Sequence, residues 1–169
     1  MTSSTVPIRV AVIGAAGRMG STVCRAVTAA PDLELVGTYD VGDDLGDLGG
    51  ADVAVEFALP AVSLANVAAC VERGVDVVVG TTGWDTARLD SLRATLDAHP
   101  GVGVLIAPNF AIGAILMMRF AQQAARFYES VEIVELHHPD KVDAPSGTAA
   151  RTADLIAAAR AEAGLGGVP

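Results

Sequence analysis

Cysteine and basic residues are scarce in this sequence, and each scarcity excludes a class of protein. Cys24 and Cys70 are the only cysteines among 169 residues, so no disulfide framework is possible. Both lie in Ala/Val-rich helical segments, which predicts small buried side chains in a reducing compartment. Lys and Arg number 11 against 20 Asp and Glu, a formal net charge of -9. Because no basic stripe offsets the acids, a nucleic-acid partner is not expected.

Long apolar runs and targeting segments are also missing. No apolar run reaches the length needed to span a bilayer, and the start, Met-Thr-Ser-Ser-Thr-Val-Pro, has neither the basic region nor the apolar region of a leader. We therefore expect a cytoplasmic protein that does not bind membranes. No residues have the spacing of metal ligands, so no metal site is predicted.

The residues that are present suit a folded α/β protein. The hydrophobic content of 51% can form a sizeable core, and the length allows one domain and part of a second. β-branched runs alternate with helical segments, which predicts a parallel sheet of the Rossmann type. The expected strands cover residues 8–13, 33–39, 51–57, 75–79 and 103–107, and expected helices cover 60–73 and 86–98.

A glycine-rich turn follows the first expected strand. The segment Gly14-Ala-Ala-Gly-Arg-Met-Gly20 permits a tight turn and lets backbone amides approach a pyrophosphate at the start of a helix. Its spacing is Gly-x-x-Gly-x-x-Gly, with Ala16 where the commonest fingerprint has its second glycine. Asp40 ends the second strand at about the expected distance, roughly twenty residues on, to accept hydrogen bonds from a ribose.

Two readings of this turn are open. Its glycines could be ordinary turn and packing residues, with Asp40 a solvated strand end. In the functional reading, an acid at position 40 repels a 2′-phosphate while Arg18 could attract one, so NADH is favoured and NADPH tolerated. Gly80, Thr81 and Thr82 follow the fourth strand, where an open parallel sheet collects ligands, and are expected near the nicotinamide; the alternative is a plain capped turn.

The segment from Glu135 to Thr148 concentrates groups that can do chemistry. Residues 130–136 alternate polar and apolar side chains and are expected to form a strand, which ends at His137 and His138. Pro139 favours a turn, and the loop after it carries Lys141 and Asp143. Ser146 precedes an Ala-rich helical run and is expected to be its N-cap.

Each of these groups has an expected role. We expect His137 to donate or accept a proton, and Lys141 to be a second proton donor that attracts an anionic substrate. His138 is expected to bind substrate, and the amides of Gly147 and Thr148 could receive a carboxylate at the helix start. The alternative is a histidine whose hydrogen bonds serve only the fold, beside a Ser-Gly-Thr sequence that only caps a helix.

The motif His-His-x-x-Lys-x-Asp-Ala-Pro-Ser-Gly-Thr resembles the signature of the 4-hydroxy-tetrahydrodipicolinate reductase (dihydrodipicolinate reductase) family of lysine and diaminopimelate synthesis. The glycine turn, Gly-Thr-Thr-Gly at Gly80 and Ala-Pro-Asn-Phe-Ala-Ile-Gly at Ala107 extend the resemblance along the chain. It implies hydride transfer from NADH or NADPH to a small anionic dicarboxylate, the cyclic imine formed from aspartate semialdehyde and pyruvate. It also implies a homotetramer whose members continue well beyond Pro169, so this chain is expected to lack some assembly contacts.

The resemblance divides the chain into a dinucleotide-binding domain, residues 1–108, and an incomplete α+β substrate domain, residues 109–169. After Phe110 a long apolar helix is expected to run to about Tyr128 and so to enter the substrate domain. The cofactor residues so implied are Gly14, Ala15, Ala16, Gly17, Arg18, Met19, Asp40, Gly80, Thr81, Thr82, Ala107, Pro108, Asn109 and Phe110. The substrate residues so implied are His138, Ser146, Gly147 and Thr148, with His137 and Lys141 catalytic.

Two other functions stay open at this point. The chain could be a dinucleotide-binding module without turnover, or another oxidoreductase such as a semialdehyde or homoserine dehydrogenase. Those dehydrogenases lack the paired histidines with Lys141. A semialdehyde dehydrogenase would also need a nucleophilic cysteine, whereas Cys24 and Cys70 are expected inside helices.

Overall fold

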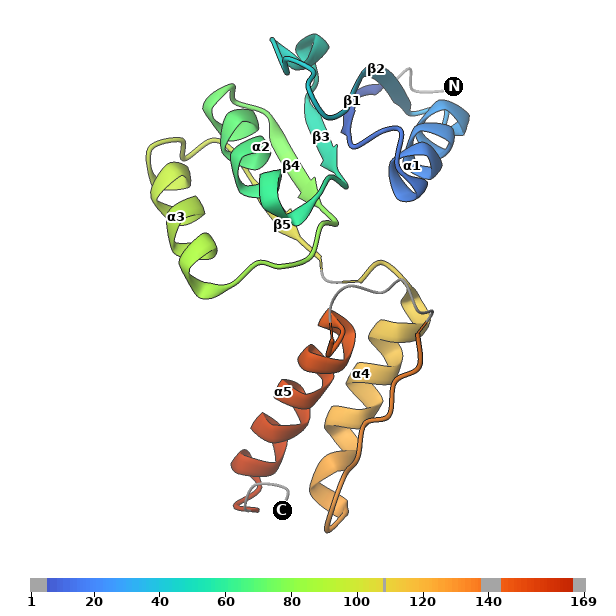
Figure 1. The fold of residues 1–169 in the computed structure, drawn as a ribbon, viewed down its shortest axis with the longest axis vertical. Coiled ribbons are helices and arrows are strands. Elements are labelled where there is room, and N and C mark those ends of the chain that lie inside the picture. The colour runs from blue at the N-terminus through green and yellow to red at the C-terminus, as the bar shows by residue number, and fades with distance from the viewer. Residues whose placement is uncertain (1–5, 108, 138–143, 166–169) are drawn as a thin grey trace. The chain divides into compact units, whose positions relative to one another are not determined.

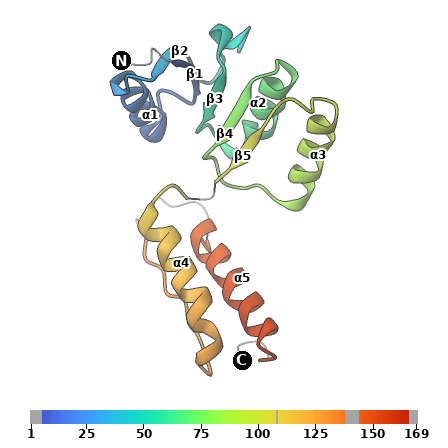
Figure 2. The same cartoon turned by 180° about the vertical axis from the view of Figure 1, so that it is seen from behind.

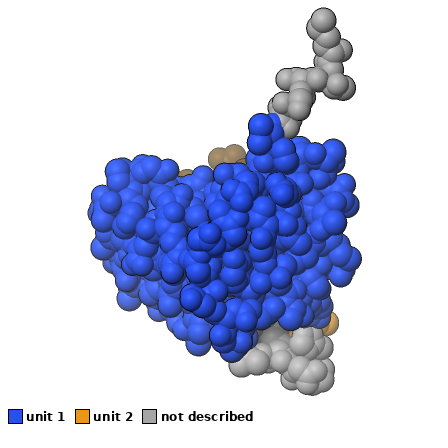
Figure 3. All heavy atoms as spheres, turned by 90° about the horizontal axis from the view of Figure 1, so that it is seen from above, with its two compact units in different colours: residues 1–107 blue, residues 108–169 orange. Residues whose placement is uncertain are grey.

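The computed structural model describes residues 6–107, 109–137 and 144–165. The chain forms two compact units, residues 1–107 and 108–169, which Figure 3 colours separately. The expected domain boundary at residue 108 falls one residue from this division. Among the described residues, no helix has the length and apolar character required to cross a membrane.

Unit 1 is built on a parallel five-stranded sheet in the order β2-β1-β3-β4-β5 (Figures 1 and 2). Its strands are β1 (Ile8–Ile13), β2 (Leu33–Tyr39), β3 (Val53–Glu56), β4 (Asp76–Val79) and β5 (Val104–Ile106). Since β1 has β2 on one side and β3 on the other, the strand order reverses at β1. A crevice at the carboxyl ends of β1 and β3 is the usual ligand site of such a sheet.

Helices cover both faces of the sheet because successive strand residues point in opposite directions. Val10 and Val12 of β1 pack in one cluster with Val27 of α1 (Arg18–Ala29). Ala11 and Ile13 face the other way, into the larger cluster. That cluster includes residues of α2 (Pro60–Glu72), α3 (Thr86–Asp97) and the short 3-10 turn η1 (Leu48–Gly50).

The alternating pattern predicted unit 1 closely, and the Rossmann-type α/β fold is confirmed. β1 and β2 have the expected bounds, and the other strands are one to three residues shorter at one or both ends. Helix α2 starts at Pro60 as expected and ends before Gly74, which has the positive φ of a helix-terminating glycine. The 3-10 turn η1 lies between β2 and β3.

Unit 2 contains two helices that pack against each other, α4 (Ile112–Ala124) and α5 (Gly147–Glu162). A 3-10 turn, η2 (Ala125–Phe127), extends α4, so the long helix expected to reach about Tyr128 is confirmed with its last turn tightened. Arg160 of α5 is buried and donates to the carbonyls of Ala125, Tyr128 and Glu129. This side chain therefore ties α5 to the chain that leaves α4.

The strand expected over residues 130–136 was wrong. The structure assigns no strand to this segment, and Val134 and Leu136 are 81% and 91% exposed. A strand is stable only when its backbone groups pair with a neighbour. The described part of unit 2 offers no other strand for pairing, so the alternating pattern by itself does not fix this backbone.

Candidate functional site

The glycine turn after β1 is held against the end of β2. The amides of Gly14 and Ala15 donate to the carbonyl of Tyr39, at 2.7 and 3.2 Å. Gly14 has φ +82°, and a Cβ there would lie 2.5 Å from the Phe57 carbonyl oxygen. Only glycine fits, because both the left-handed backbone and the contact with Phe57 exclude a side chain.

Asp40 closes the same turn from the side of β2. Its carboxylate accepts from the Ala16 amide, with Oδ2 at 2.9 Å and Oδ1 at 3.1 Å, and its own amide donates to Asp43 at 2.8 Å. The sequence predicted Asp40 near the turn but did not predict this bond. Asp40 thus positions the turn as well as facing the space beside it.

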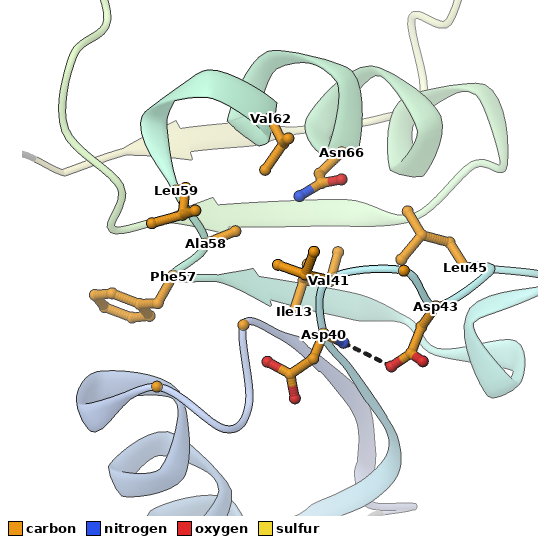
Figure 4. A pocket seen from close by; sticks show the side chains of 13 residues that line it. Ile13, Asp40, Val41, Asp43, Leu45, Phe57, Ala58, Leu59, Val62 and Asn66 are labelled. Carbon is orange, nitrogen blue, oxygen red and sulfur yellow. Dashed lines mark hydrogen bonds between the residues drawn. The ribbon is translucent and has the colours of Figure 1, made fainter.

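A hollow of about 280 Å³ lies at the carboxyl ends of β1 and β3 (Figure 4). We call it the switch-point hollow. Gly14, Gly17 and Asp40 line it, together with other side chains of the loop after β2 and side chains of α2. Its other lining residues are Ile13, Val41, Gly42, Asp43, Leu45, Phe57, Ala58, Leu59, Val62 and Asn66. The described lining holds two carboxylates and no Lys or Arg, which disfavours an added phosphate.

A second, more open hollow of about 480 Å³ starts on the other side of Gly17. We call it the α1 hollow. It shares Gly17, Phe57 and Ala58 with the switch-point hollow. The remaining lining residues are Arg18, Met19, Pro60, Gly80, Thr81 and Thr82. The structure therefore brings the glycine turn and the Gly80–Thr82 turn to one surface.

The first turn of α1 faces the α1 hollow without a capping side chain. Gly17 occupies the N-cap position, and the first turn contains no acidic residue. By contrast, α3 and α5 are capped by Asp85 and Ser146. The leading amides of α1 have no partner within the helix, and Arg18 adds a positive charge beside them. This set fits a pyrophosphate.

The loop between β3 and α2 was missing from the predicted site, although it joins the two hollows. The Phe57 ring lies so close to Gly80 that any Cβ at position 80 would overlap it. Thr81 Oγ1 donates to the Ala58 carbonyl at 3.1 Å. The signal for this loop was its place after the strand that pairs with β1, at the reversal of strand order.

Buried Glu56 supports that loop. It is 0% exposed, and its carboxylate accepts from the Ala58 amide at 3.2 Å and from Ser63 Oγ at 2.9 Å. One carboxylate thus links the end of β3 to the first turn of α2. Sequence alternation placed Glu56 in a strand but gave no reason for a buried acid.

In unit 2, a second group of polar side chains surrounds the start of α5. Glu135 Oε1 accepts from the Ser146 amide at 2.8 Å, and Glu135 Oε2 lies 2.8 Å from Nε2 of His137. Hydrogen bonds lower the pKa of Glu135 from 4.5 to about 2, and the Ser146 side chain has the largest effect, followed by His137 and then the Ser146 amide. Glu135 was not among the predicted site residues.

The N-cap predicted at Ser146 is confirmed, since its hydroxyl accepts from the Ala149 amide at 3.1 Å. The amide and the hydroxyl of Ser146 therefore both form hydrogen bonds within unit 2. Thr148 Oγ1 accepts from Asn109 Nδ2 at 3.0 Å, which leaves the hydroxyl proton of Thr148 free to be donated. Asn109 Oδ1 also accepts from the amide of Ala111, the residue that precedes α4.

Comparison with known proteins identifies the family. The model described as "Dihydrodipicolinate reductase, N-terminus" matches residues 8–110, and "Dihydrodipicolinate reductase, C-terminus" matches residues 113–167. The chain belongs to the dihydrodipicolinate reductase family. Similar proteins include the 4-hydroxy-tetrahydrodipicolinate reductases of Cutibacterium acnes, 60% identical over 162 residues, and Nocardia farcinica, 60% identical over 164 residues.

These dihydrodipicolinate reductases are longer than this chain. Each alignment covers 96% of the chain and 66% of the relative. Among solved structures, a dipicolinate-bound dihydrodipicolinate reductase from Paenisporosarcina sp. TG-14 is 35% identical with a TM-score of 0.72, covering 92% of this chain and 67% of that one. The comparison thus extends over both units.

Several residues of the dihydrodipicolinate reductase motif lie outside the described residues. These are His138, Lys141 and Asp143, as well as Pro108. Ala107 follows β5, where its amide donates to Val79 at 3.0 Å, and Phe110 is 49% exposed. The residues that the structure describes contain no group of three or more His, Cys, Asp or Glu side chains suited to a metal ion.

Proposed function

We propose that this chain carries the NADH-dependent reduction of 4-hydroxy-tetrahydrodipicolinate to tetrahydrodipicolinate in lysine and diaminopimelate synthesis. The observation that carries the proposal is the 60% identity, over nearly the whole chain, to proteins named for this reaction. The hydrogen bonds around His137 and the two hollows of unit 1 support it. NADPH is accepted less well, because Asp40 and Asp43 line the switch-point hollow.

Unit 1 would bind the dinucleotide. The switch-point hollow would hold the adenosine half, with Asp40 accepting hydrogen bonds from the ribose hydroxyls. The pyrophosphate would meet the uncapped start of α1 and Arg18, and Gly80, Thr81 and Thr82 would line the nicotinamide half. Ala107, Pro108, Asn109 and Phe110 belong to this proposed cofactor set. A bound nicotinamide supplies the hydride.

Unit 2 would bind the anionic substrate. The leading amides of α5, at Gly147 and Thr148, and the Thr148 hydroxyl would donate to a carboxylate, with Ser146 holding the turn. His138 and Lys141 would add positive charge, and Lys141 would be a second proton donor. The solved relative binds dipicolinate, itself a planar dicarboxylate, which supports this substrate class.

Proton transfer falls to His137 in this proposal. Replacing the substrate hydroxyl by hydrogen consumes one hydride and one proton and releases one water. An imidazole can accept a proton on one ring nitrogen and donate it again, which suits His137 to this step. We place the protein in the cytoplasm, where the free thiols of Cys24 and Cys70 stay reduced, and expect a homotetramer.

The proposal is tested by following consumption of NADH. The purified chain is mixed with NADH and substrate freshly made from aspartate semialdehyde and pyruvate. We expect turnover that falls by about 10²- to 10⁴-fold in His137→Ala. The matched control is His99→Ala, since His99 belongs to unit 1 and lies at the end of α3. A solution mass measured on the same sample gives the oligomeric state.

A second candidate is a dinucleotide-binding module without turnover. The coverage of the relatives favours it, because the chain spans 66% of their length. In that case NADH fluorescence would show binding while NADH is never consumed, so dipicolinate would have no turnover to inhibit. Turnover that is inhibited by dipicolinate would reject this candidate. Another class of dehydrogenase is disfavoured, because Cys24 and Cys70 lie inside α1 and α2 rather than in either hollow.

A further inference from the structure

Glu135 holds two groups at once, and this determines how it can act. One carboxylate oxygen accepts from the Ser146 amide and the other lies 2.8 Å from His137 Nε2. The Glu135 side chain is 26% exposed and that of His137 is 38% exposed, so water reaches both. The bond to Ser146 spans eleven positions of sequence and fixes the acid to the N-cap of α5.

The state of the carboxylate decides which nitrogen of His137 carries a proton. The hydrogen bonds that lower the Glu135 pKa to about 2 keep this group ionised near neutral pH. An ionised carboxylate can only accept hydrogen bonds, so Nε2 of His137 must be the donor. In the neutral ring, Nδ1 is then the unprotonated nitrogen.

We propose that Glu135 is a positioning residue for the reaction, which holds His137 in the Nε2–H form and so leaves Nδ1 to exchange a proton with the substrate. This inference rests on the proposed function and assigns the reacting atom within it. In the imidazolium, Nδ1 gives its proton to the substrate as hydride is accepted, and the ring becomes neutral with Nε2–H retained. Solvent then returns one proton to Nδ1.

The link to Ser146 explains why an acid, rather than any acceptor, is used here. Glu135 accepts two donors that belong to different parts of unit 2, the histidine and the first turn of α5. A carboxylate can satisfy both with separate oxygens, and it stabilises the imidazolium as well. The histidine is thereby fixed relative to the amides of Gly147 and Thr148, which are the proposed carboxylate site.

Glu135→Gln separates positioning from folding. The Ser146 amide can only donate, so the glutamine oxygen must face it, and the glutamine NH₂ must face His137 Nε2. The link to α5 is kept, but Nε2 becomes an acceptor and the ring must move its proton to Nδ1. Glu132→Gln is the matched control, because it removes the same charge from an exposed residue of the same segment.

Nitrogen NMR of the imidazole rings tests the proposal without turnover. The chain has three histidines, so the ring signals can be assigned with His→Gln variants. His99 is an internal reference, because its Nδ1 donates to the Thr95 carbonyl at 2.9 Å and it must hold the opposite form. We expect neutral His137 to be protonated at Nε2 in the native chain and in Glu132→Gln, and at Nδ1 in Glu135→Gln.

Steady-state kinetics supply the second readout. In Glu135→Gln we expect kcat to fall by about 10²-fold while the Kd for NADH stays within about twofold. Glu132→Gln should keep kcat within about twofold. Native His137 protonated at Nδ1, or equal losses of kcat in the two variants, would overturn the proposal. A chain with Nε2–H at His137 that never consumes NADH would instead reject the proposed function, since the spectra do not depend on turnover.

Discussion

The Asp40 carboxylate accepts the Ala16 amide with both oxygens, at 2.9 and 3.1 Å, and so joins the end of β2 to the glycine turn after β1. Asp40 also lines the switch-point hollow. Its removal should therefore loosen the turn and remove an acceptor for a ribose. We predict that Asp40→Ala raises the Kd for NADH about tenfold or more, since a hydrogen bond to a charged group contributes about 1.5–3 kcal/mol. NADH fluorescence titration measures this change.

Asp44→Ala is the control for charge, because Asp44 lies in the same loop and is absent from the described lining of both hollows. Asp40→Asn should also shift the preference towards NADPH, as the charge that repels a 2′-phosphate is gone. If Asp44→Ala weakens NADH binding as much as Asp40→Ala does, only the net charge matters and Asp40 has no local role.

Gly14→Ala should destabilise unit 1 and weaken cofactor binding together. The positive φ at position 14 is strained for alanine, and the alanine Cβ would lie only 2.5 Å from the Phe57 carbonyl oxygen. We predict a loss of at least about 1–3 kcal/mol in the free energy of unfolding. Urea unfolding followed by the fluorescence of Trp84, the single tryptophan, reports on unit 1.

The control for this variant is Gly101→Ala. No atom lies within 4 Å of a Cβ at position 101, and its φ is not positive. Its free energy of unfolding should stay the same or rise by up to about 1 kcal/mol. Equal unfolding midpoints for the two variants would show that the turn tolerates a side chain.

Hydrophobic periodicity and helix-capping residues predicted those elements whose positions depend mainly on their own sequence. β1 and β2 are buried β-branched runs that end at a turn, and Ser146 is followed by an uninterrupted helical sequence, so their positions followed from periodicity and capping. Residues 130–136 have the same alternation but form no strand, because pairing with another strand cannot be read from the segment itself.

Only part of the candidate site could be predicted, because residue types and spacing do not show which residues meet in space. The glycine turn, Asp40 and the Gly80–Thr82 turn carry recognisable residue types at strand ends, and the structure places them on adjoining hollows. Phe57 and Glu135 were missed. Phe57 is an aromatic residue after a strand, and Glu135 is one of two acids in an alternating segment. Their roles depend on which residues they meet in space, which sequence spacing does not give.

Buried Glu56 provides a test of the loop between β3 and α2. Glu56→Ala leaves the Ala58 amide and the Ser63 hydroxyl without their acceptor, so we predict a loss of about 1–3 kcal/mol in the free energy of unfolding. Glu56→Gln should cost less, because its oxygen can accept from Ala58 and its NH₂ can donate to the Ser63 hydroxyl. Trp84 fluorescence in urea measures both variants, and a glutamine variant as unstable as the alanine variant would contradict this account.

The two cysteines should differ in reactivity. Burial raises the pKa of the Cys70 thiol to about 11, and Cys70 is 0% exposed, whereas Cys24 is partly exposed. The thiolate is the reactive form, so Cys70 should resist iodoacetamide at neutral pH until the chain unfolds. Mass spectrometry of the native chain should find alkylation at Cys24 first, and Cys24→Ala should then label only in denaturant. Rapid labelling of Cys70 in the native chain would show that α2 opens readily.

Acid should weaken unit 2 through Glu135. Its pKa is lowered from 4.5 in the unfolded chain to about 2 in the folded chain, mainly by the hydrogen bonds from Ser146. A lowered folded-state pKa means that the folded chain binds the proton less tightly than the unfolded chain. The stabilisation is therefore complete above pH 4.5 and is lost as the pH falls towards 2. Thermal unfolding monitored by circular dichroism should show native chain more stable than Glu135→Gln above pH 4.5, with the difference shrinking below it. A difference that stays constant down to pH 2 would mean that the Glu135 charge does not stabilise the start of α5.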